Sequence, residues 1–553
     1  MMKANVNGRP DAWCDAKISE VASVNPTLDK AGIPDDLEVS FVPMPAVQAE
    51  SGIIDVSGKR KFSEVKKGYT PFCEGDVLFA KITPCMENGK IAVVPEVING
   101  IGFGSTEFHV LRALSGMNAK YIYYYVSSQA FRRQAEHNMS GAVGQRRVTT
   151  PYLSACDVPL PPTNEQHRIV AKIEELFSEL DKGIECLKAA REQLKVYRQA
   201  LLKHAFEGKL TAQWRAAERH AKQSVAPAKA GAQPLNDMDS RPTPSRGLAL
   251  RGKDEVGGGN DKPLETAADL LKRIQQERTQ RYQQQLADWE ASGKQGSKPN
   301  PPKTLPPLTA EELAELTELP EGWGWCKVAH ICDVVRGGSP RPAGDPKFYG
   351  GDIPFLKVAD ITSTSAPYLN SFTFTITKAG LSKTRQIEPN TLLLSNSGAT
   401  LGVPKICLIP ATMNDGVAAF LGLPHETLLY HYYFWQSKTE YLRNIDQGAA
   451  QPNLNTDLIK ETFIPICSAP EQLVVIDKLE AALSETDQLD QTITTALQQA
   501  EALRQSILKK AFSGQLVPQD PNDEPASELL ARIKAERLAS QGKLVVRRKR
   551  RQS

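Results

Sequence analysis

The sequence predicts an α+β protein: two mixed, β-rich globular domains separated by two long antiparallel coiled-coil helices, internally repeated with pseudo-two-fold symmetry. Three observations predict this fold class. The 553-residue chain aligns with itself at an offset of 306 positions, and each aligned copy carries apolar residues at helical spacing. Each copy also follows about 150 residues that are rich in short β-like runs. At roughly 150 residues per domain, the length itself predicts three to four domains.

The repeat is clearest in residues 165–210, which align with 471–516 without a gap and are identical at 17 of 46 positions. Two unrelated helices of similar composition would not keep register over this length, so we interpret the match as a duplication. The shared residues include Glu165/Glu471, Asp181/Asp487, Arg198/Arg504, Gln199/Gln505, Phe206/Phe512 and Gly208/Gly514.

Each copy is predicted to be one long helix, because apolar or small residues recur at alternating steps of four and three, as in a coiled-coil seam. A helix of about 40 residues is ~60 Å long, and Gly208 and Gly514 are expected to end the two helices. The two seams are expected to pack against each other; alternatively, each helix packs on its own neighbouring domain. The predicted seam residues are Ile169, Ile173, Leu176, Leu180, Leu187, Leu194, Leu201, Val475, Leu479, Leu489, Ile493, Leu503 and Ile507.

The β-rich domains are predicted at residues 1–162 and 322–467, where runs such as 76–82 and 391–395 are separated by Gly, Pro and Asn. The two domains resemble each other in sequence only at their edges. The helical spacers are then residues 163–215 and 468–516. A duplicated frame that holds two divergent domains suggests one task performed twice on different targets.

The remaining segments are linkers and short helices. Residues 216–262 are expected to be a disordered linker, since 19 of the 42 residues in 221–262 are Ala, Gly, Pro or Ser. Residues 263–294 are expected to be a helical extension, because 270–278 resembles 529–537. A Pro-rich linker is predicted at 295–321. A short helix and a basic tail are predicted at 517–553, with the basic run 547–551 more often disordered than bound to phosphates.

Composition excludes several classes of protein. The net charge is +3, from 67 basic and 64 acidic residues, so any nucleic-acid surface must be local. No run of 18 apolar residues and no signal-peptide core is present, which predicts no membrane partner. The nine cysteines form no CxxC pair and the histidines show no HxxxH spacing, so no metal site is expected. These features are typical of a cytoplasmic protein.

Apparent catalytic motifs do not withstand inspection. The segment 300–303 reads Asn-Pro-Pro-Lys, but an amino-methyltransferase needs an aromatic residue at the fourth place to stack on the base. The segment 247–253 nearly fits a phosphate loop, yet Asp254 stands where magnesium needs Ser or Thr. We therefore expect no catalytic residue in this chain, which is more typical of a binding protein or a scaffold.

Ten short strings of the sequence, taken together and in order, are informative. They lie at 75–78, 83–90, 105–108, 144–148, 160–166, 205–210, 319–323, 349–354, 397–402 and 451–455. In this order they resemble strings of the specificity subunit of a type I restriction–modification enzyme. The resemblance covers nearly the whole chain except 216–262. Two departures are Asn414-Asp415, where such domains often have Asn-Gln, and a degraded Pro-rich exit at 466–470.

The resemblance implies that each β-rich domain is a target-recognition domain that reads one half of a split double-stranded DNA sequence. It implies that the helices set the spacing and dock two modification (methyltransferase) subunits, and that restriction (translocase and nuclease) subunits join them. S-adenosylmethionine, ATP and magnesium would then be bound by those partners, and no cofactor by this chain. The chain would be a non-catalytic subunit of a restriction endonuclease and adenine-specific DNA methyltransferase complex.

Base edges are read by polar side chains that loops project into a groove. We therefore predict DNA-binding residues at Lys81, Thr83, Asn88, Lys90, Gln145, Arg146 and Arg147 in the first domain, and at Ser339, Arg341, Ser397, Thr400, Asn414, Gln451 and Asn453 in the second. Because the two sets differ, the two half-sites should differ as well. The alternative hypotheses are a helical protein-interaction scaffold whose DNA-binding domains are unrelated to restriction, and a single chain that both reads and modifies DNA.

Overall fold

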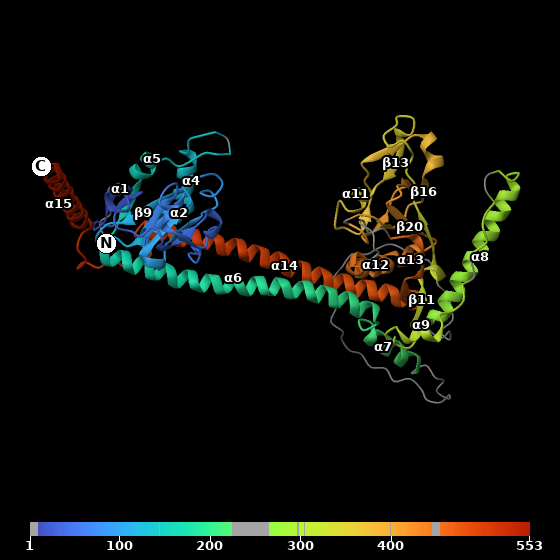
Figure 1. Ribbon diagram of the computed structural model, residues 1–553. Coiled ribbons are helices and arrows are strands. Elements are labelled where there is room, and N and C mark those ends of the chain that lie inside the picture. Colours follow the sequence, from blue (N-terminus) through green and yellow to red (C-terminus); the bar gives the residue numbers. More distant parts are fainter. Residues whose placement is uncertain are drawn as a thin grey trace, which may run out of the picture. The chain divides into compact units, whose positions relative to one another are not determined.

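The computed structural model describes residues 9–142, 144–223, 265–295, 298–302, 305–398, 400–444 and 454–552, without the side chains of 221–223 and 540–552. The chain divides into two compact units (Figure 1). Unit 1 comprises Met1–Ala190 and Gln491–Ser553, and unit 2 comprises Arg191–Asp490. Each unit holds one β-rich domain and parts of the two longest helices.

The β-rich domain of unit 1 contains two four-stranded sheets, in the orders β2-β9-β6-β7 and β4-β3-β8-β5, and the strand pair β1–β10. Its strands are β1 Cys14–Lys17, β2 Ala22–Val24, β3 Glu38–Val42, β4 Lys59–Lys61, β5 Thr70–Cys73, β6 Val77–Ala80, β7 Ile91–Val93, β8 Ile101–Gly104, β9 Phe108–Ala113 and β10 Asp157–Leu160. Its helices are α1 Ile18–Val21, η1 Met44–Ala46, α2 Phe62–Val65, η2 Ile98–Gly100, α3 Ala119–Ser127, α4 Gln129–His137 and α5 Thr150–Ala155.

The central strand β6 shows why this sequence forms a two-layer core. All four of its side chains are buried, and successive side chains point to opposite faces of a strand. Leu78 and Ala80 join an apolar cluster with Phe72 of the second sheet. Phe79 joins another cluster with Tyr121 of α3. One face of the sheet is therefore covered by strands and the other by helices.

Unit 2 repeats this topology with different residues. Its sheets run β12-β20-β17-β18-β14 and β15-β13-β19-β16, and β11 pairs with β21. Its strands are β11 Gly324–Lys327, β12 Asp333–Arg336, β13 Tyr349–Leu356, β14 Tyr368–Leu369, β15 Phe374–Ile376, β16 Arg385–Ile387, β17 Thr391–Ser395, β18 Pro404–Cys407, β19 Ala411–Met413, β20 Val417–Leu421 and β21 Phe463–Ile466. Its helices are α9 Ala310–Ala314, α10 Val328–Ile331, α11 Val358–Ile361, η3 Lys378–Lys383, η4 His425–Thr427, α12 Leu428–Asn444 and α13 Thr456–Glu461.

The correspondence extends to strand direction. In each unit one strand of the second sheet pairs in parallel with its neighbour, β3 with β8 and β13 with β19, while β6–β9 and β17–β20 are antiparallel. The alternation of side chains is repeated too, because Leu394 faces the helices and Leu393 faces the second sheet. The two divergent sequences thus build one fold twice.

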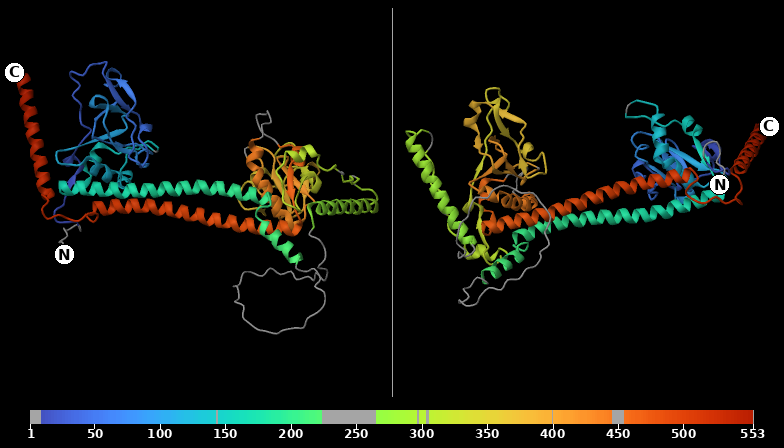
Figure 2. Two further views of the ribbon diagram at one scale, coloured as in Figure 1. Left: turned by 90° about the horizontal axis from the view of Figure 1, so that it is seen from below. Right: turned by 180° about the vertical axis from the view of Figure 1, so that it is seen from behind.

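The two long helices are α6, Thr163–Phe206, and α14, Ala469–Phe512. They run antiparallel: in unit 1 Asp181 forms an ion pair with Arg504, and in unit 2 Arg198 forms one with Asp487. Asp487 lies 306 positions after Asp181, and Arg504 lies 306 positions after Arg198. The same ion pair therefore forms once in each unit, with the two helices exchanging the acidic and the basic partner. Figure 2 shows both helices from two further sides.

The predicted seam residues are buried near the helix ends and exposed at two positions. Ile169, Ile173 and Ile507 are buried in unit 1, and Leu201, Val475 and Leu479 are buried in unit 2, where each group joins the core of a β-rich domain. Ile493 is buried as well. Leu176, Leu180, Leu187 and Leu194 are half-buried.

Leu489 and Leu503 are 48% and 50% exposed, respectively. The prediction that these two leucines are buried is wrong, because a pair of helices without a third surface cannot cover every seam position.

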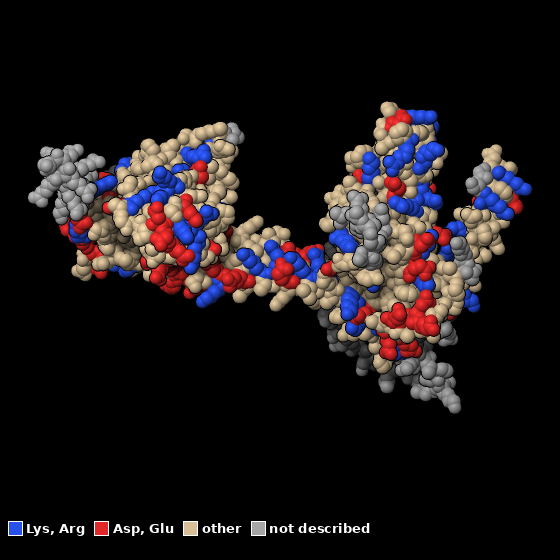
Figure 3. Space-filling view, viewed as in Figure 1, with Lys and Arg blue, Asp and Glu red and all other residues tan. Residues whose placement is uncertain are grey.

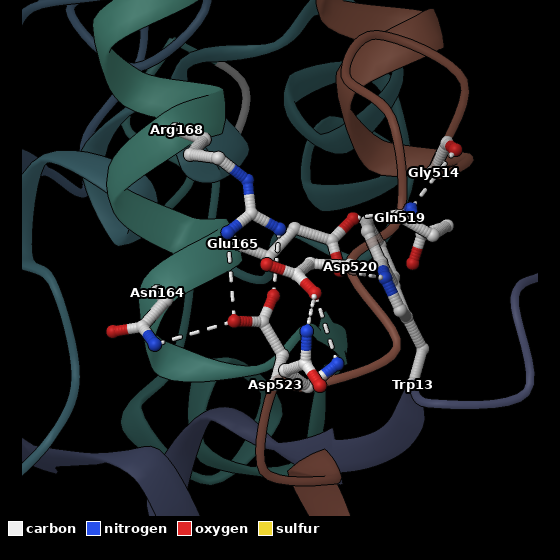
Figure 4. A network of polar contacts seen from close by, with 9 residues as sticks. Trp13, Asn164, Glu165, Arg168, Gly514, Gln519, Asp520 and Asp523 are labelled. Carbon is white, nitrogen blue, oxygen red and sulfur yellow. Dashed lines mark hydrogen bonds and ion pairs between the residues drawn. The ribbon is translucent and has the colours of Figure 1, made fainter.

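Both helices end as predicted at glycines in the left-handed region, Gly208 with φ 69° and Gly514 with φ 75°. Beyond them, the chain folds back on the start of the other helix. In unit 1, Trp13 Nε1 donates to Glu165 Oε2 at 3.0 Å, and Gln519 also donates to that carboxylate. Figure 4 shows this network, in which Arg168 and Asn164 bind Asp523.

Unit 2 holds the equivalent glutamate in a different way. Arg215 donates to Glu471 Oε1 at 2.6 Å, and the Thr211 hydroxyl donates to the same oxygen at 2.7 Å. Both members of the ion pair are buried. Arg215 lies on α7, Ala212–Gln223, which corrects the predicted linker: residues 216–223 are helical, and 224–262 lie outside the described residues.

The helical extensions α8, Ala267–Ala291, and α15, Ala526–Gln552, dock in the same way. Ala267 N donates to the Gly322 carbonyl, and Ala526 N donates to the Ala12 carbonyl, both at 2.9 Å. Further along, Arg278 donates to the carbonyl of Ala329 on α10. Arg537 donates in the same way to the carbonyl of Ser19 on α1. The C-terminal helix is 27 residues long rather than short, and it continues through the basic run that was expected to be disordered.

No helix in the described ranges is both long enough and apolar enough to cross a membrane.

Candidate nucleic-acid interface

In unit 1 the seven predicted residues lie on two neighbouring segments. The first, residues 81–90, follows β6. The second, residues 140–150, leads into α5, and Val143 within it lies outside the described residues. Main-chain hydrogen bonds join them, from Val148 N to the Lys81 carbonyl at 2.8 Å and from Thr83 N to the Arg146 carbonyl at 3.0 Å. The structure therefore brings together all seven residues, although Lys81 and Arg147 are 66 positions apart in the chain.

These seven side chains are not equally available. Asn88 and Gln145 are exposed, and Lys81, Arg146 and Arg147 are half-buried. Thr83 Oγ1 donates to Glu87 at 3.1 Å, and Lys90 Nζ donates to the Met44 carbonyl at 3.2 Å. Thr83 and Lys90 therefore already have a protein partner.

Arg147 is held by a carboxylate that the sequence analysis did not single out. Its guanidinium donates to both oxygens of Glu107, with distances from 2.8 to 3.2 Å. The bond to Arg147 is the largest cause that lowers the pKa of Glu107. Arg146 Nη2 lies 3.7 Å from Glu87 Oε1, and its side chain is 40% exposed. Of the two arginines, Arg146 is the one less engaged within the protein.

In unit 2 the five described candidates surround the turn before β20. Ser339 Oγ donates to Asp415 Oδ1 at 2.6 Å, and Arg341 lies 3.8 Å from the other oxygen of this carboxylate. Ser397 and Asn414 flank Gly416, where an added Cβ would lie 2.8 and 3.4 Å from them. Thr400 lies in the same loop as Ser397 and accepts, through its carbonyl, a 2.6 Å bond from Ser395 Oγ.

Two predicted residues of unit 2, Gln451 and Asn453, lie outside the described residues. The chain immediately after them is nevertheless placed. Leu454 N donates to the Asn396 carbonyl at 2.8 Å, just as Val148 N donates to the Lys81 carbonyl at 2.8 Å in unit 1. Leu454 and Val148 are separated by the repeat offset of 306. The same backbone connection therefore supports the candidate site of each unit.

Each unit also has a carboxylate just before one of two equivalent strands, β9 in unit 1 and β20 in unit 2. Glu107 precedes β9, and Asp415 precedes β20 by one residue more. Each carboxylate faces an arginine of the candidate site, Arg147 or Arg341. Sequence reasoning missed this role of the two acids, although Asp415 was noted as a departure from the usual Asn-Gln.

Three further residues of unit 2 extend the candidate surface. Leu356 accepts a 2.9 Å bond from Asn414 N, which places the next residue, Lys357, beside the site. Lys357 Nζ lies 3.4 Å from the centre of the Phe374 ring. Phe372 and Phe374 are 44% and 39% exposed. The signal that could have found them is the unusual sequence Phe372-Thr373-Phe374 in an otherwise polar segment.

Charge is unevenly distributed over unit 2. Figure 3 shows Lys and Arg gathered on the part of the unit that carries β13 and β16, and Asp and Glu gathered near α9. The exposed basic residues there include Arg341, Lys347, Lys378, Lys383 and Arg385. Such a local basic surface suits contact with phosphates even though the net charge of the chain is small. Among the described residues, no group of three or more His, Cys, Asp and Glu is arranged to hold a metal ion.

The sequence of this chain is similar to those of known DNA specificity domains and subunits. The family model for the type I restriction modification DNA specificity domain matches residues 10–189 and 320–499. Two Escherichia coli relatives, the specificity subunits of the type I restriction enzymes EcoAI and EcoEI, are each 27% identical to this chain, over 91% of its length and 83% of theirs.

Solved structures show the same fold. One chain of a type I R–M system has a TM-score of 0.57 at 17% identity and covers 92% of this chain and 99% of its own length. The HsdS subunit from Thermoanaerobacter tengcongensis has a TM-score of 0.50 at 18% identity, with coverage of 92% and 98%. The two matched segments together span more than half of the chain and coincide with the two β-rich domains and their helices. The chain belongs to the family of type I restriction modification DNA specificity domains and carries two of them.

Proposed function

We propose that this chain is the specificity subunit of a type I restriction–modification complex, and that each β-rich domain reads one half of an asymmetric, bipartite DNA site. The observation that carries the proposal is the repeated connection between the loop after the central strand and the segment that follows, Val148–Lys81 in unit 1 and Leu454–Asn396 in unit 2. One backbone frame thus presents two different sets of polar side chains. A frame of this kind is what two unlike half-sites require.

The chemistry of the presented side chains supports base and phosphate contact. Asn88, Gln145 and Asn414 carry amides that can form bidentate bonds with adenine, and Arg341 can do so with guanine. Each good bidentate contact discriminates against a wrong base by ~1–3 kcal/mol. Arg146 suits a phosphate. Glu107 holds Arg147 through hydrogen bonds before DNA arrives, whereas Arg341 is largely exposed and lies 3.8 Å from Asp415.

The helices α6 and α14 are proposed to set the gap between the half-sites and to dock two modification subunits. Restriction subunits would join this assembly. S-adenosylmethionine, ATP and magnesium are proposed to bind to those partners. This chain would then recognise the DNA sequence, and its partners would catalyse the reactions. Because the proposed ligand is cellular and incoming DNA, the proposed place of action is the cytoplasm.

The deciding experiment is genome-wide mapping of methylated adenine in cells that express the partner subunits with or without this chain. The expected result is a split motif that appears only when the chain is present. Exchanging residues 322–467 for the corresponding domain of a relative should change one half of the motif and keep the other. A motif that does not depend on the chain, or methylation by the purified chain with methyl donor alone, would overturn the proposal and favour a scaffold or a complete enzyme.

A further inference from the structure

A buried histidine lies directly behind the candidate site of unit 1. His109 of β9 is 2% exposed, and its Nε2 lies 2.8 Å from the Val148 carbonyl oxygen. A carbonyl oxygen can only accept, so Nε2 carries the proton. The other ring nitrogen, Nδ1, then accepts a 3.0 Å bond from Asn25 Nδ2, which lies closer to it than Asn25 Oδ1 at 3.4 Å. These two bonds define the neutral Nε2–H tautomer of this imidazole.

The orientation of Asn25 is itself fixed. Its Oδ1 accepts a 3.0 Å bond from Val110 N, so its Nδ2 must point to the histidine. The same Nδ2 donates to Thr150 Oγ1 at 3.2 Å. Asn25 adopts a left-handed backbone conformation with φ 51°, which asparagine tolerates better than most residues. The histidine therefore holds Val148 directly and Thr150 through Asn25.

This network sits behind the polar side chains of residues 140–150. Val148 is 1% exposed, and its N–H bonds the Lys81 carbonyl while its own carbonyl bonds His109. Both polar backbone groups of Val148 are thus fixed within the domain. The preceding residues Gln145 and Arg146 are then left to face outward.

We propose that His109 is a positioning residue which, as the neutral Nε2–H tautomer, holds segment 140–150 in its DNA-reading conformation, and that protonation of His109 releases this segment. The inference rests on the proposed function of that segment. Imidazolium has two N–H donors, so its Nδ1–H would oppose the Asn25 Nδ2 donor. Asn25 would have to turn its Oδ1, which lies 3.4 Å from Nδ1, toward the ring and give up its bonds to Val110 N and Thr150.

The surroundings of His109 set the pH at which this happens. Burial is the largest cause that lowers its pKa below 6.5, and Lys81 lowers it further, while the bond to Val148 and the charge of Glu107 act in the opposite direction. Glu107 is in turn paired with Arg147. Because the folded chain favours the neutral form, the stabilisation should be fully present above pH 6.5, and the bonds should be lost as the pH falls through the lowered pKa of the folded chain.

Unit 2 provides an internal control. Phe79 pairs with His109 in the β6–β9 ladder, and Leu394 pairs with Ala418 at the matching place in the β17–β20 ladder. Ala418 cannot titrate or donate from its side chain. The half-site read by unit 2 should therefore not share the pH response of the half-site read by unit 1.

The test is hydrogen–deuterium exchange with mass spectrometry on the full chain, comparing wild type, His109→Ala and His109→Gln across a pH series from 7.5 to 4.5. In His109→Ala the amides of residues 140–150 should exchange about tenfold faster, since a buried acceptor is left unpaired. His109→Gln should keep most of the protection, because its amide can both donate to Val148 and accept from Asn25.

Lowering the pH should speed exchange in wild type relative to the unit 2 peptide 454–461, but not in His109→Gln. Unchanged protection in His109→Ala, or an equal pH response in His109→Gln, would overturn the positioning role. His137→Gln, on the exposed end of α4, serves as the matched control.

A second readout separates this inference from the proposed function. In cells with the partner subunits, His109→Ala should relax one half of the methylated motif and leave the other half intact. If exchange responds as expected while both halves stay unchanged, His109 still positions the segment, but the segment does not read DNA. That result would contradict the proposed function of residues 140–150 and leave the fold-level role of His109 in place.

Discussion

The glutamates in the first turns of the two long helices, Glu165 and Glu471, occupy equivalent positions with different partners, which predicts unequal losses of stability from one substitution. Glu471→Gln leaves the buried guanidinium of Arg215 without its counter-charge, so the free energy of unfolding should fall by about 3 kcal/mol. Glu165→Gln keeps an acceptor for Trp13, so the change should stay within about 1 kcal/mol. Thermal unfolding of both variants checks the difference.

The pH dependence of stability provides a further test of the Glu165 site. Burial raises the pKa of Glu165 above its ordinary value of 4.5. The folded chain therefore binds this proton more tightly than the unfolded chain, and the associated stability is lost as the pH rises from 4.5 through the folded pKa. Glu165→Gln should remove that dependence. Equal destabilisation by both substitutions at neutral pH would contradict the structural assignment of the two partners.

Arg146 provides a prediction for the DNA contact. If it binds a phosphate, Arg146→Ala should weaken binding about equally on all sequences and should reduce the slope of log affinity against log salt by about 1. Fluorescence anisotropy of the assembled complex on a duplex with the mapped motif measures both quantities. Arg133→Ala, an exposed arginine on α4, is the matched control and should change neither.

At the residue scale, sequence reasoning found side chains that loops present but not the groups that hold them. Lys81, Asn88 and Arg146 were predicted because bases are read by polar side chains that loops project into a groove. Glu107 and His109 could not be predicted, because their partners Arg147 and Val148 lie about 40 residues away and meet them only through the strand pairing of β6 with β9.

Glycine should stabilise the end of a long helix and destabilise its centre. Gly514 has φ 75°, and a Cβ there would lie 2.5 Å from Pro10, so Gly514→Ala should destabilise unit 1 by about 1–2 kcal/mol. Gly183 lies inside α6 with nothing within 4 Å of an added Cβ. Gly183→Ala should therefore stabilise the same unit by roughly 0.5–1 kcal/mol. Denaturant unfolding of the two variants decides this; destabilisation by Gly183→Ala would refute the helical environment.

The two equivalent ion pairs between α6 and α14 should not contribute equally. Arg504 is 19% exposed and its guanidinium lies 4.5 Å from the centre of the Phe177 ring, whereas Arg198 is 44% exposed. Arg504→Ala should lower the melting temperature more than Arg198→Ala, which is expected to cost less than about 1 kcal/mol. The double variant Asp181→Arg/Arg504→Asp exchanges the two charges and should recover part of the melting temperature lost in Arg504→Ala. If it recovers none, the packing of Arg504 on Phe177 contributes more to stability than the ion pair does.

At the element scale, the helices were predictable and the sheets only partly so. A 3.5-residue pattern and an ungapped repeat specify α6 and α14 directly. The common topology of the two sheet pairs was not visible, because strands such as β6 and β17 keep burial but share only one residue identity, Leu78 with Leu393. Leu489 and Leu503 show the limit of the pattern, since heptad spacing says which residues face one side but not whether anything covers them.

For the whole molecule, the proposed spacer role makes a quantitative prediction. Removing seven residues from both α6 and α14 keeps the apolar register and shortens each helix by ~10 Å. This corresponds to about three base pairs at 3.4 Å each. Mapping of methylated adenine should then show both half-sites unchanged and the gap between them reduced. Altered half-site bases with an unchanged gap would exclude the spacer role.

The division of the chain into units has a consequence for its synthesis. Unit 2 is one continuous stretch, Arg191–Asp490, whereas unit 1 needs both Met1–Ala190 and Gln491–Ser553. The core of unit 1 includes Ile507, Leu508 and Ala511 from α14, and Leu529 and Ile533 from α15. A growing chain acquires structure domain by domain as it leaves the ribosome. The β-rich domain of unit 1 is translated first but can complete its core only after residues 507–533 have been made, so the β-rich domain of unit 2 can fold before it.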